Sequence, residues 1–278
     1  MGVIIIQIRR PLLIILMFVV AISFIITNNT KNDEELNDKI ITIQGVVKGK
    51  IEKKRYNQYK VGVFLINDYT KNKNLKIGQK VNITGKFKSL DKMKYDDFDY
   101  GRYIKSTGYK GIVYINNYKI IDKNKLYSLI GEIKFYISKT YRYLYKKNSD
   151  FINSILLAEV ENLTEEQKEI FTRTGTSHVI SISGLHTGIL CVIISFLLRG
   201  INKLYKLLIL SIFITLYCIM VGASPSIIRS IAFVMIFYLS IFIDRKKDGI
   251  SALSLIGIIL IMNNPYVCLL YTSDAADE

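Results

Sequence analysis

The sequence predicts an α-helical multi-pass membrane protein with a small all-β domain inserted on the extracytoplasmic side. Half of the 278 residues are hydrophobic, and yet 38 basic residues outnumber 23 acidic ones. The two properties are separated along the chain, because residues 31–147 hold 27 basic and 12 acidic residues and the remainder holds 11 of each. This composition excludes an ordinary soluble enzyme, a disordered chain and a disulfide-stabilised scaffold.

The first predicted element is a transmembrane anchor within residues 1–30. Residues 11–29 carry no charge and follow Arg9 and Arg10 directly. A segment of this length and polarity is typical of a membrane-spanning helix. A cleaved signal peptide is the alternative, since residues 21–23 form an acceptable cleavage site. The additional apolar residues 3–6 favour the uncleaved anchor.

Residues 31–123 predict a β domain. Short runs rich in Val, Ile and Tyr, at 40–47, 59–66, 80–84 and 111–115, are typical of strands. Four or five strands in this length fit a small closed barrel of the oligonucleotide/oligosaccharide-binding (OB) type. Basic residues interleaved with tyrosines favour a polyanion such as DNA, although anionic lipid or wall polymer would suit the charge too. The tyrosines concerned are Tyr56, Tyr59, Tyr69, Tyr95, Tyr100, Tyr103 and Tyr109.

Residues 124–177 predict a helical region. Apolar residues recur three and four positions apart from Leu126 to Leu144, which indicates an amphipathic helix on a membrane surface or against other helices. Thr164 followed by Gln167 predicts a capping box at the start of a second helix.

Four further spans are predicted within residues 178–271, at 179–198, 207–221, 226–243 and 250–271, which gives five in total. Arg9, Arg10 and the basic loops 199–206 and 244–248 all fall on one side if the N-terminus is cytoplasmic. Residues 31–177 are then extracytoplasmic. We interpret residues 272–278 as a solvated tail or an artefact of the reading frame.

One polar motif lies at the mouth of the second span. It places His178, Ser181, Ser183 and His186 where polar groups either line a pathway or allow close helix packing. Ser183 and His186 also permit an intramembrane serine hydrolase, but no acidic residue is available nearby to orient the histidine.

A second motif occupies residues 222–229. Ser224 and Pro225 predict a helix start, with Ser226 and Arg229 in its first turns. A helix N-terminus favours anions, so Arg229 there suits contact with phosphate. The alternative is an arginine whose charged end snorkels to the membrane surface.

No metal, cofactor or disulfide is predicted. Cys191, Cys218 and Cys268 are isolated in apolar stretches, and the chain has two histidines. A nucleotide-binding loop is also missing from the sequence, so energy for transport has to come from elsewhere.

Both motifs carry a resemblance to the ComEC family of competence proteins. The stretch 171–186 resembles the family signature, as do Tyr217 with residues 222–229 and the pair Asn264-Pro265. Residues 98–111 look like the end of the family's OB-like domain. The resemblance implies a membrane channel component for uptake of single-stranded DNA in natural transformation. It implies a separate DNA receptor and an ATP-driven motor as partners, together with the lipid bilayer and, in some arrangements, further copies of the chain.

The chain also departs from the family pattern. Family members have a longer bundle, and many carry a C-terminal metallo-β-lactamase-like nuclease domain whose metal cluster two histidines cannot supply. We therefore expect a truncated member or N-terminal fragment without enzymatic activity. A membrane-anchored extracytoplasmic module that binds polyanions is the main alternative, and the serine hydrolase is the second.

Overall fold

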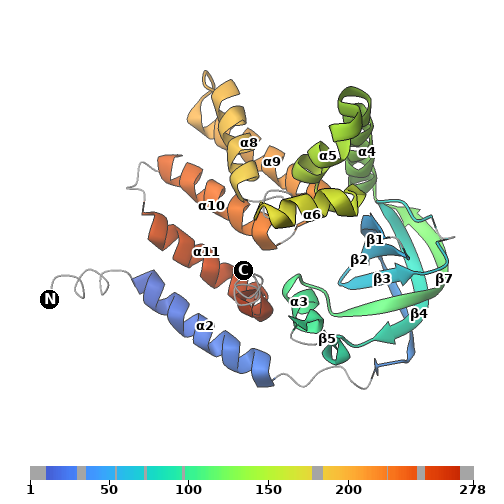
Figure 1. The fold of residues 1–278 in the computed structure, drawn as a ribbon. Coiled ribbons are helices and arrows are strands. Elements are labelled where there is room, and N and C mark those ends of the chain that lie inside the picture. The colour runs from blue at the N-terminus through green and yellow to red at the C-terminus, as the bar shows by residue number, and fades with distance from the viewer. Residues whose placement is uncertain are drawn as a thin grey trace.

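The computed structural model describes residues 11–29, 36–53, 55–71, 74–95, 98–176, 184–223, 225–242 and 248–269. A β-barrel lies on one side of the molecule and a group of apolar helices, called the long helices here, on the other, with further helices above the barrel (Figure 1). The chain passes from the first long helix into the barrel and returns to the remaining long helices at its C-terminal end.

The barrel is closed by five strands in the order β1-β2-β3-β7-β4. β3 and β7 are parallel, and the other neighbouring pairs are antiparallel. The strands are β1 (Ile40–Glu52), β2 (Asn57–Val61), β3 (Phe64–Asp68), β4 (Gln79–Lys88) and β7 (Gly111–Lys123). The small barrel that the sequence predicts is confirmed.

One strand prediction was wrong. The run 59–66 was expected to form a single strand, but the chain reverses within it and forms β2 and β3. Gly62 makes the reversal possible because it adopts a φ of 59°, a left-handed conformation that glycine takes without a steric penalty. The strands β1 and β7 are also longer than predicted, and both pair with β4 over much of its length.

The barrel encloses its own hydrophobic core. Alternate residues of each strand point inward, and several of them are completely buried. A second cluster lies outside the barrel wall, where Leu65 and Ile112 are covered by η2 (Leu90–Lys92) and α3 (Tyr100–Ser106). Between these two elements, β5 (Lys94–Tyr95) pairs with β6 (Phe98–Asp99). The fully buried inner residues include Val47, Tyr59, Ile66, Val81, Ile83 and Val113.

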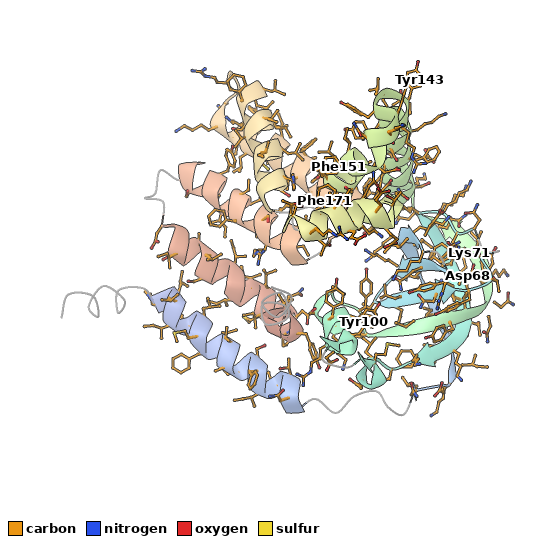
Figure 2. The ribbon with its side chains drawn as sticks, viewed as in Figure 1. Asp68, Lys71, Tyr100, Tyr143, Phe151 and Phe171 are labelled. Atoms are coloured by element: carbon orange, nitrogen blue, oxygen red, sulfur yellow. The ribbon has the colours of Figure 1, made fainter. Side chains whose placement is uncertain are left out.

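The helical region that follows the barrel agrees with its prediction. α4 (Lys125–Tyr145) packs against α5 (Ser149–Leu157) and α9 (Lys203–Val221), while Leu129 and Tyr136 remain exposed. α6 (Glu165–Arg173) begins with the predicted capping box between Thr164 and Gln167. The rings of Phe151 and Phe171 stack with centroids 5.4 Å apart and so join α5 to α6 (Figure 2). Short turns η3 (Lys146–Asn148) and η4 (Val160–Asn162) complete this region.

Five apolar helices correspond to the five predicted spans. α2 and α9 are long and apolar enough to cross a membrane, whereas the apolar parts of α8, α10 and α11 are shorter. α2 packs along α11, α10 packs against α11 and α9, and α8 packs against α10 (Figure 1). Their bounds are α2 (Pro11–Asn29), α8 (Gly184–Leu197), α9 (Lys203–Val221), α10 (Pro225–Phe242) and α11 (Gly249–Asn263).

The last predicted span, 250–271, is not one continuous helix. α11 ends at Asn263, and η5 (Pro265–Leu269) follows. Asn264 has an extended backbone with φ −147° and ψ 103°, because the ring of the next proline disfavours the helical conformation in the residue before it. The helix therefore stops at the Asn264-Pro265 pair.

Candidate functional site

The structure brings the two polar motifs to the same end of the helix group. His186 lies in the first turn of α8, and Arg229 lies about one turn inside α10, which packs against α8. Leu190 of α8 and Ile231 of α10 both pack on the cluster formed by Tyr217, Val221 and Ile227, so the two helix starts are level with each other. His186 and Arg229 are both half-buried. Each makes an interaction of its own within the protein.

The remaining residues of the first motif are not tested. His178, Ser181 and Ser183 lie outside the described residues, so the geometry of the Ser183/His186 pair stays a prediction. His186 is followed by Thr187, which is almost completely buried, with 1% of its surface exposed. The described part of this motif is therefore turned partly into the protein.

The helix start in the second motif is confirmed. α10 begins at Pro225, in the first helical position where its missing N–H leaves no helical hydrogen bond unmade. Gly222 ends α9 with a φ of 93°, which allows the reversal between the two helices. Ser224 and the side chain of Ser226 lie outside the described part, so the predicted cap is not tested.

Several helix ends meet the barrel region at this same level. The Tyr217 hydroxyl near the end of α9 donates a hydrogen bond to the Leu156 carbonyl at 3.1 Å. Lys60 of β2 reaches the turn after α9, since its Nζ lies 3.8 Å from where a Cβ on Gly222 would be. The end of α9 and the start of α10 therefore adjoin both α5 and the barrel.

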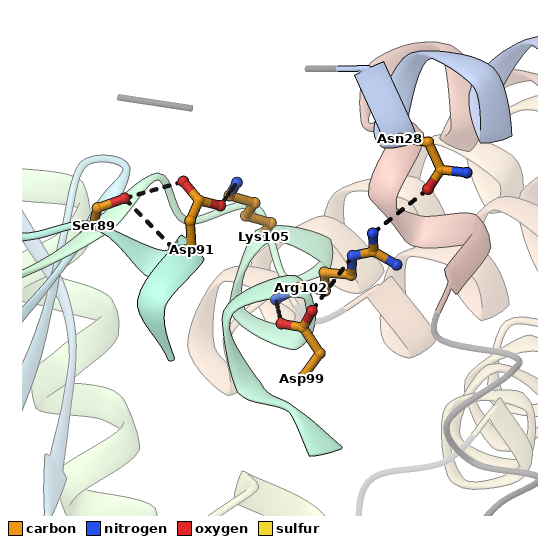
Figure 3. Close-up of polar contacts among 6 residues, drawn as sticks. All are labelled: Asn28, Ser89, Asp91, Asp99, Arg102 and Lys105. Carbon is orange, nitrogen blue, oxygen red and sulfur yellow. Dashed lines mark hydrogen bonds and ion pairs between the residues drawn. The ribbon is translucent and has the colours of Figure 1, made fainter. Parts of the chain in front are cut away.

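α3 connects the barrel to the ends of α2 and α11. Asn264, just after α11, donates hydrogen bonds from Nδ2 to the carbonyls of Lys105 (2.9 Å) and Ser106 (3.2 Å). Arg102 Nη2 reaches Asn28 Oδ1 of α2 at 3.5 Å (Figure 3). Ser23 of α2 in turn donates to the Pro265 carbonyl at 2.8 Å. These contacts place α2 and α11 against one side of α3.

An ion pair stabilises the α3 side of this junction. Lys105 Nζ lies 2.6 Å from Asp91 Oδ1, and both side chains are more than four-fifths buried (Figure 3). Ser89 Oγ donates to the other carboxylate oxygen of Asp91 at 3.1 Å. Lys105 Nζ also lies 5.3 Å from the ring centroid of Tyr266, a cation–π distance. One lysine thus links the barrel to the segment after α11.

A pocket of about 480 Å³ opens at this junction. Its barrel side carries Ser89, Lys105 and Lys110, and its helix side carries Ile228 and Leu260. Asn263 and Asn264 also line the helix side. This junction was not predicted from the sequence, although Asn264 before a proline and the polar stretch 102–107 are features that could have indicated it.

The tyrosines predicted to contact DNA differ in how far they are exposed. Tyr59 is a core residue with no exposed surface, so its predicted role in base stacking was wrong; its burial raises the pKa of the hydroxyl. Tyr109 also packs on the second cluster, and burial raises its pKa to about 12. Tyr69 and Tyr103 are exposed, Tyr56 and Tyr100 are half-buried, and the side chain of Tyr95 is outside the described part.

Comparison with known proteins matches the helical part of the chain to a family. Residues 155–271 match the family described as Competence protein, and this range contains both polar motifs and α8 to α11. ComE operon protein 3 of Bacillus subtilis (strain 168) is 25% identical over 146 residues, which cover 52% of this chain and 19% of the relative. The match therefore spans about a fifth of that relative's length.

Among solved structures, aspartyl tRNA synthetase from Entamoeba histolytica aligns with 62% of this chain and 37% of its own. The TM-score is 0.24 and the sequence identity 11%, which is too distant a likeness to carry any argument. The assignment comes from the sequence comparisons and the two motifs. They show that residues 155–271, which carry both motifs of the ComEC resemblance, are similar to the Competence protein family.

Proposed function

We propose that this chain forms the outer, DNA-receiving part of the channel that takes single-stranded DNA across the cytoplasmic membrane in natural transformation. In this proposal the barrel lies outside the membrane and binds the strand, and α2 and α8 to α11 cross the membrane beneath it. The observation that carries the proposal is the meeting of the ends of α2, α9 and α11 and the start of α10 at the barrel side.

These ends are the ones that the loop charges assign to the outside. Arg199 follows α8, and Lys203 and Lys206 lie in the first turn of α9, at the opposite end of that helix from Tyr217 and Gly222. Short basic loops are retained in the cytoplasm, so the opposite ends face outward. The N-terminus is then cytoplasmic, and residues 31–177 are extracytoplasmic. A long translocated segment is compatible with this rule, whatever its own charge.

The two motifs supply the proposed entry to the pathway. Phosphates that leave the barrel would meet the starts of α8 and α10, where His186 and Arg229 lie in adjacent helices. Arg229 offers a fixed positive charge at a helix N-terminus, and both features favour an anion. His178, Ser181, Ser183, Ser224 and Ser226 remain candidates for the same pathway on their sequence positions.

Transport by this route needs partners. The proposal includes a separate DNA receptor that delivers the strand, an ATP-driven motor that supplies energy and a bilayer around α2 and α8 to α11. It also allows several copies of the chain to assemble around one pathway. The family's nuclease activity is not assigned to these residues.

Substitution of Arg229 in a naturally transformable host tests the proposal. Arg229→Ala should reduce uptake of labelled DNA to background while the amount of protein in the membrane stays unchanged. Arg229→Lys should retain part of the uptake, because the lysine charge still attracts phosphate but cannot form the bidentate hydrogen bonds of arginine. Arg199→Ala, in the predicted cytoplasmic loop, is the matched control and should transport normally.

The alternative function is an anchored module that only binds polyanions. It has one observation in its favour, the barrel's self-contained core. Wild-type uptake in Arg229→Ala would contradict the pathway role and leave the anchored module. Loss of membrane protein in both Arg229 variants would instead indicate a structural arginine.

A further inference from the structure

The outer face of β2, β3 and β7 is divided into two halves. Residues that alternate with the core point outward here, among them Leu65 and Ile112, which η2 and α3 cover. The second half lies towards the start of β2 and the end of β3, where Gln58 and Asn67 alternate with the core residues Tyr59 and Ile66. Gln58 Nε2 and Asn67 Oδ1 form a hydrogen bond of 2.8 Å on this second half, and both residues are 4% exposed.

Three tyrosines come together at this second half, and one of them, Tyr114, also packs on the covered cluster that contains Leu65 and Ile112. Asn57 pairs with Asp68 across β2 and β3, so Tyr56 and Tyr69 face each other one position beyond that pair. Asn67 pairs with Tyr114 across β3 and β7, which brings Tyr114 to the other side of Tyr69. We call Tyr56, Tyr69 and Tyr114 the tyrosine row.

The rings of the tyrosine row are in contact. The centroids of Tyr56 and Tyr69 are 4.9 Å apart with an interplanar angle of 34°, and those of Tyr69 and Tyr114 are 5.8 Å apart at 37°. Tyr69, the middle ring, is 55% exposed, whereas the two outer rings are half-buried. The row is therefore a continuous aromatic surface with one open ring in its centre, formed by the residue before β2, the residue after β3 and one residue of β7.

Positive charge lies at one end of the row. Lys53 Nζ is 5.2 Å from the ring centroid of Tyr56 and donates a hydrogen bond of 3.2 Å to its hydroxyl. Arg55 is exposed in the same turn, and Lys71 is exposed two residues after Tyr69. Asp68, the carboxylate next to Tyr69 in the sequence, is completely buried and accepts hydrogen bonds from Thr70.

The row is also accessible. Figure 2 labels Asp68 and Lys71, which bracket Tyr69 in sequence, at the edge of the barrel away from the long helices. Tyr69 is more than half exposed, so a ligand can reach the central ring of the row. An exposed aromatic surface beside flexible cations fits a strand whose bases stack on rings and whose phosphates meet Lys and Arg.

We propose that the tyrosine row is a binding site for the unpaired bases of single-stranded nucleic acid, with Lys53 and Arg55 contacting the adjoining phosphates. This proposal rests on the proposed function and assigns residues to its first step. A duplex does not fit this mode, since its bases already stack on each other and present only their edges. Because every base has a π face, binding at the row should depend weakly on sequence.

The test compares an oligothymidylate with an abasic phosphodiester of the same length, using the full chain in nanodiscs and fluorescence anisotropy. Wild-type protein should bind the oligothymidylate on the order of tenfold more tightly, because only this probe can stack. Tyr69→Ala should remove this preference and leave binding of the abasic probe unchanged. That unchanged binding also shows that the variant is folded.

Two further variants sharpen the test. Tyr69→Leu keeps an apolar cover over the wall without a π face and should behave like Tyr69→Ala, whereas Tyr69→Phe should keep the preference. Lys53→Ala should instead reduce the dependence of log affinity on log salt by about 0.7, the value for one contact with a single strand. Tyr143→Ala changes a tyrosine of α4 that is 82% exposed and serves as the control, with no effect expected.

The outcomes separate this inference from the proposed function. Equal binding of both probes by wild-type protein, or an undiminished preference in Tyr69→Ala and Tyr69→Leu, would overturn the tyrosine row while DNA binding by the chain stands. Binding of neither probe at low salt would overturn both.

Discussion

The barrel and the long helices differ in where their apolar side chains lie. The barrel encloses side chains such as Tyr59, Ile66 and Ile83 with no exposed surface. Because its apolar side chains are removed from water, the barrel is suited to an aqueous environment. α2 instead presents large apolar side chains outward, with Met17 69% and Phe18 66% exposed. A helix of this kind needs an apolar environment around it. One chain thus combines a domain that buries its apolar side chains with helices that expose them.

Polar groups follow the same division. In the barrel, the buried Asp68 is satisfied by Thr70, and Gln58 pairs with Asn67 across two strands. In the long helices, Thr215 donates to the Ser211 carbonyl and Ser254 to the Ile250 carbonyl, one turn back in the same helix. Such local bonds suit a hydrocarbon surrounding, because no water is needed to satisfy the hydroxyl.

The largest effect is expected from glycine substitutions that distinguish the two regions. A Cβ on Gly85 of β4 would lie 2.2 Å from the Tyr114 carbonyl oxygen and 2.8 Å from Val113 Cγ1, so Gly85→Val must displace β7. We expect the barrel to lose about 3 kcal/mol or more of unfolding free energy, measured by chemical denaturation.

Gly188 in α8 provides the matched control. Among the described residues, nothing lies within 4 Å of a Cβ built there, so Gly188→Ala should leave the stability of the protein nearly unchanged. Equal sensitivity at both glycines would contradict the view that the barrel is the tightly packed region.

The next prediction tests the junction between the two regions. Asn264→Ala removes both hydrogen bonds to the α3 carbonyls of Lys105 and Ser106, each worth about 1 kcal/mol. We expect faster amide hydrogen exchange in α3 and η5, with exchange in the barrel core unchanged. The side chain of the preceding residue, Asn263, is exposed, so Asn263→Ala should show no such change. Unaltered exchange in α3 with Asn264→Ala would show that the junction does not depend on these bonds.

A smaller effect is expected from Tyr109, on how the stability of the protein changes with pH above neutrality. Its pKa is about 12 in the folded protein against 10.0 for the ordinary side chain, because burial disfavours the phenolate. The folded state therefore holds the neutral form, and this stabilisation is complete below pH 10 and lost as the pH rises towards about 12. Tyr109→Phe should make stability less dependent on pH in this window, followed by circular dichroism. An identical alkaline transition in wild type and variant would contradict this role.

The sequence predicted elements well where one periodicity dominated. Alternation in residues 40–47 and the three–four spacing in α4 each have one structural interpretation, and both elements formed, with β1 extending further than predicted. The reversal at Gly62 was missed because apolar residues continue on both sides of it and hide the turn.

The site was harder to predict than the fold. A helix start depends on the residues next to it, and the start predicted at Pro225 was confirmed. The contacts of Asn264 with Lys105 and of Tyr56 with Tyr69 depend on how distant segments pack, which no local pattern records. Tyr59 shows the converse, since it resembles its exposed neighbours in the sequence and differs only in pointing into the barrel.

The most direct test of the account is the side of the membrane on which the barrel lies. In a variant without native cysteines, Asn74→Cys in an exposed barrel loop should react with an impermeant thiol reagent in intact cells. Lys203→Cys, at the start of α9, should react only after the membrane is permeabilised. The reverse pattern, with Lys203→Cys labelled in intact cells and Asn74→Cys protected, would place the barrel in the cytoplasm and contradict the account.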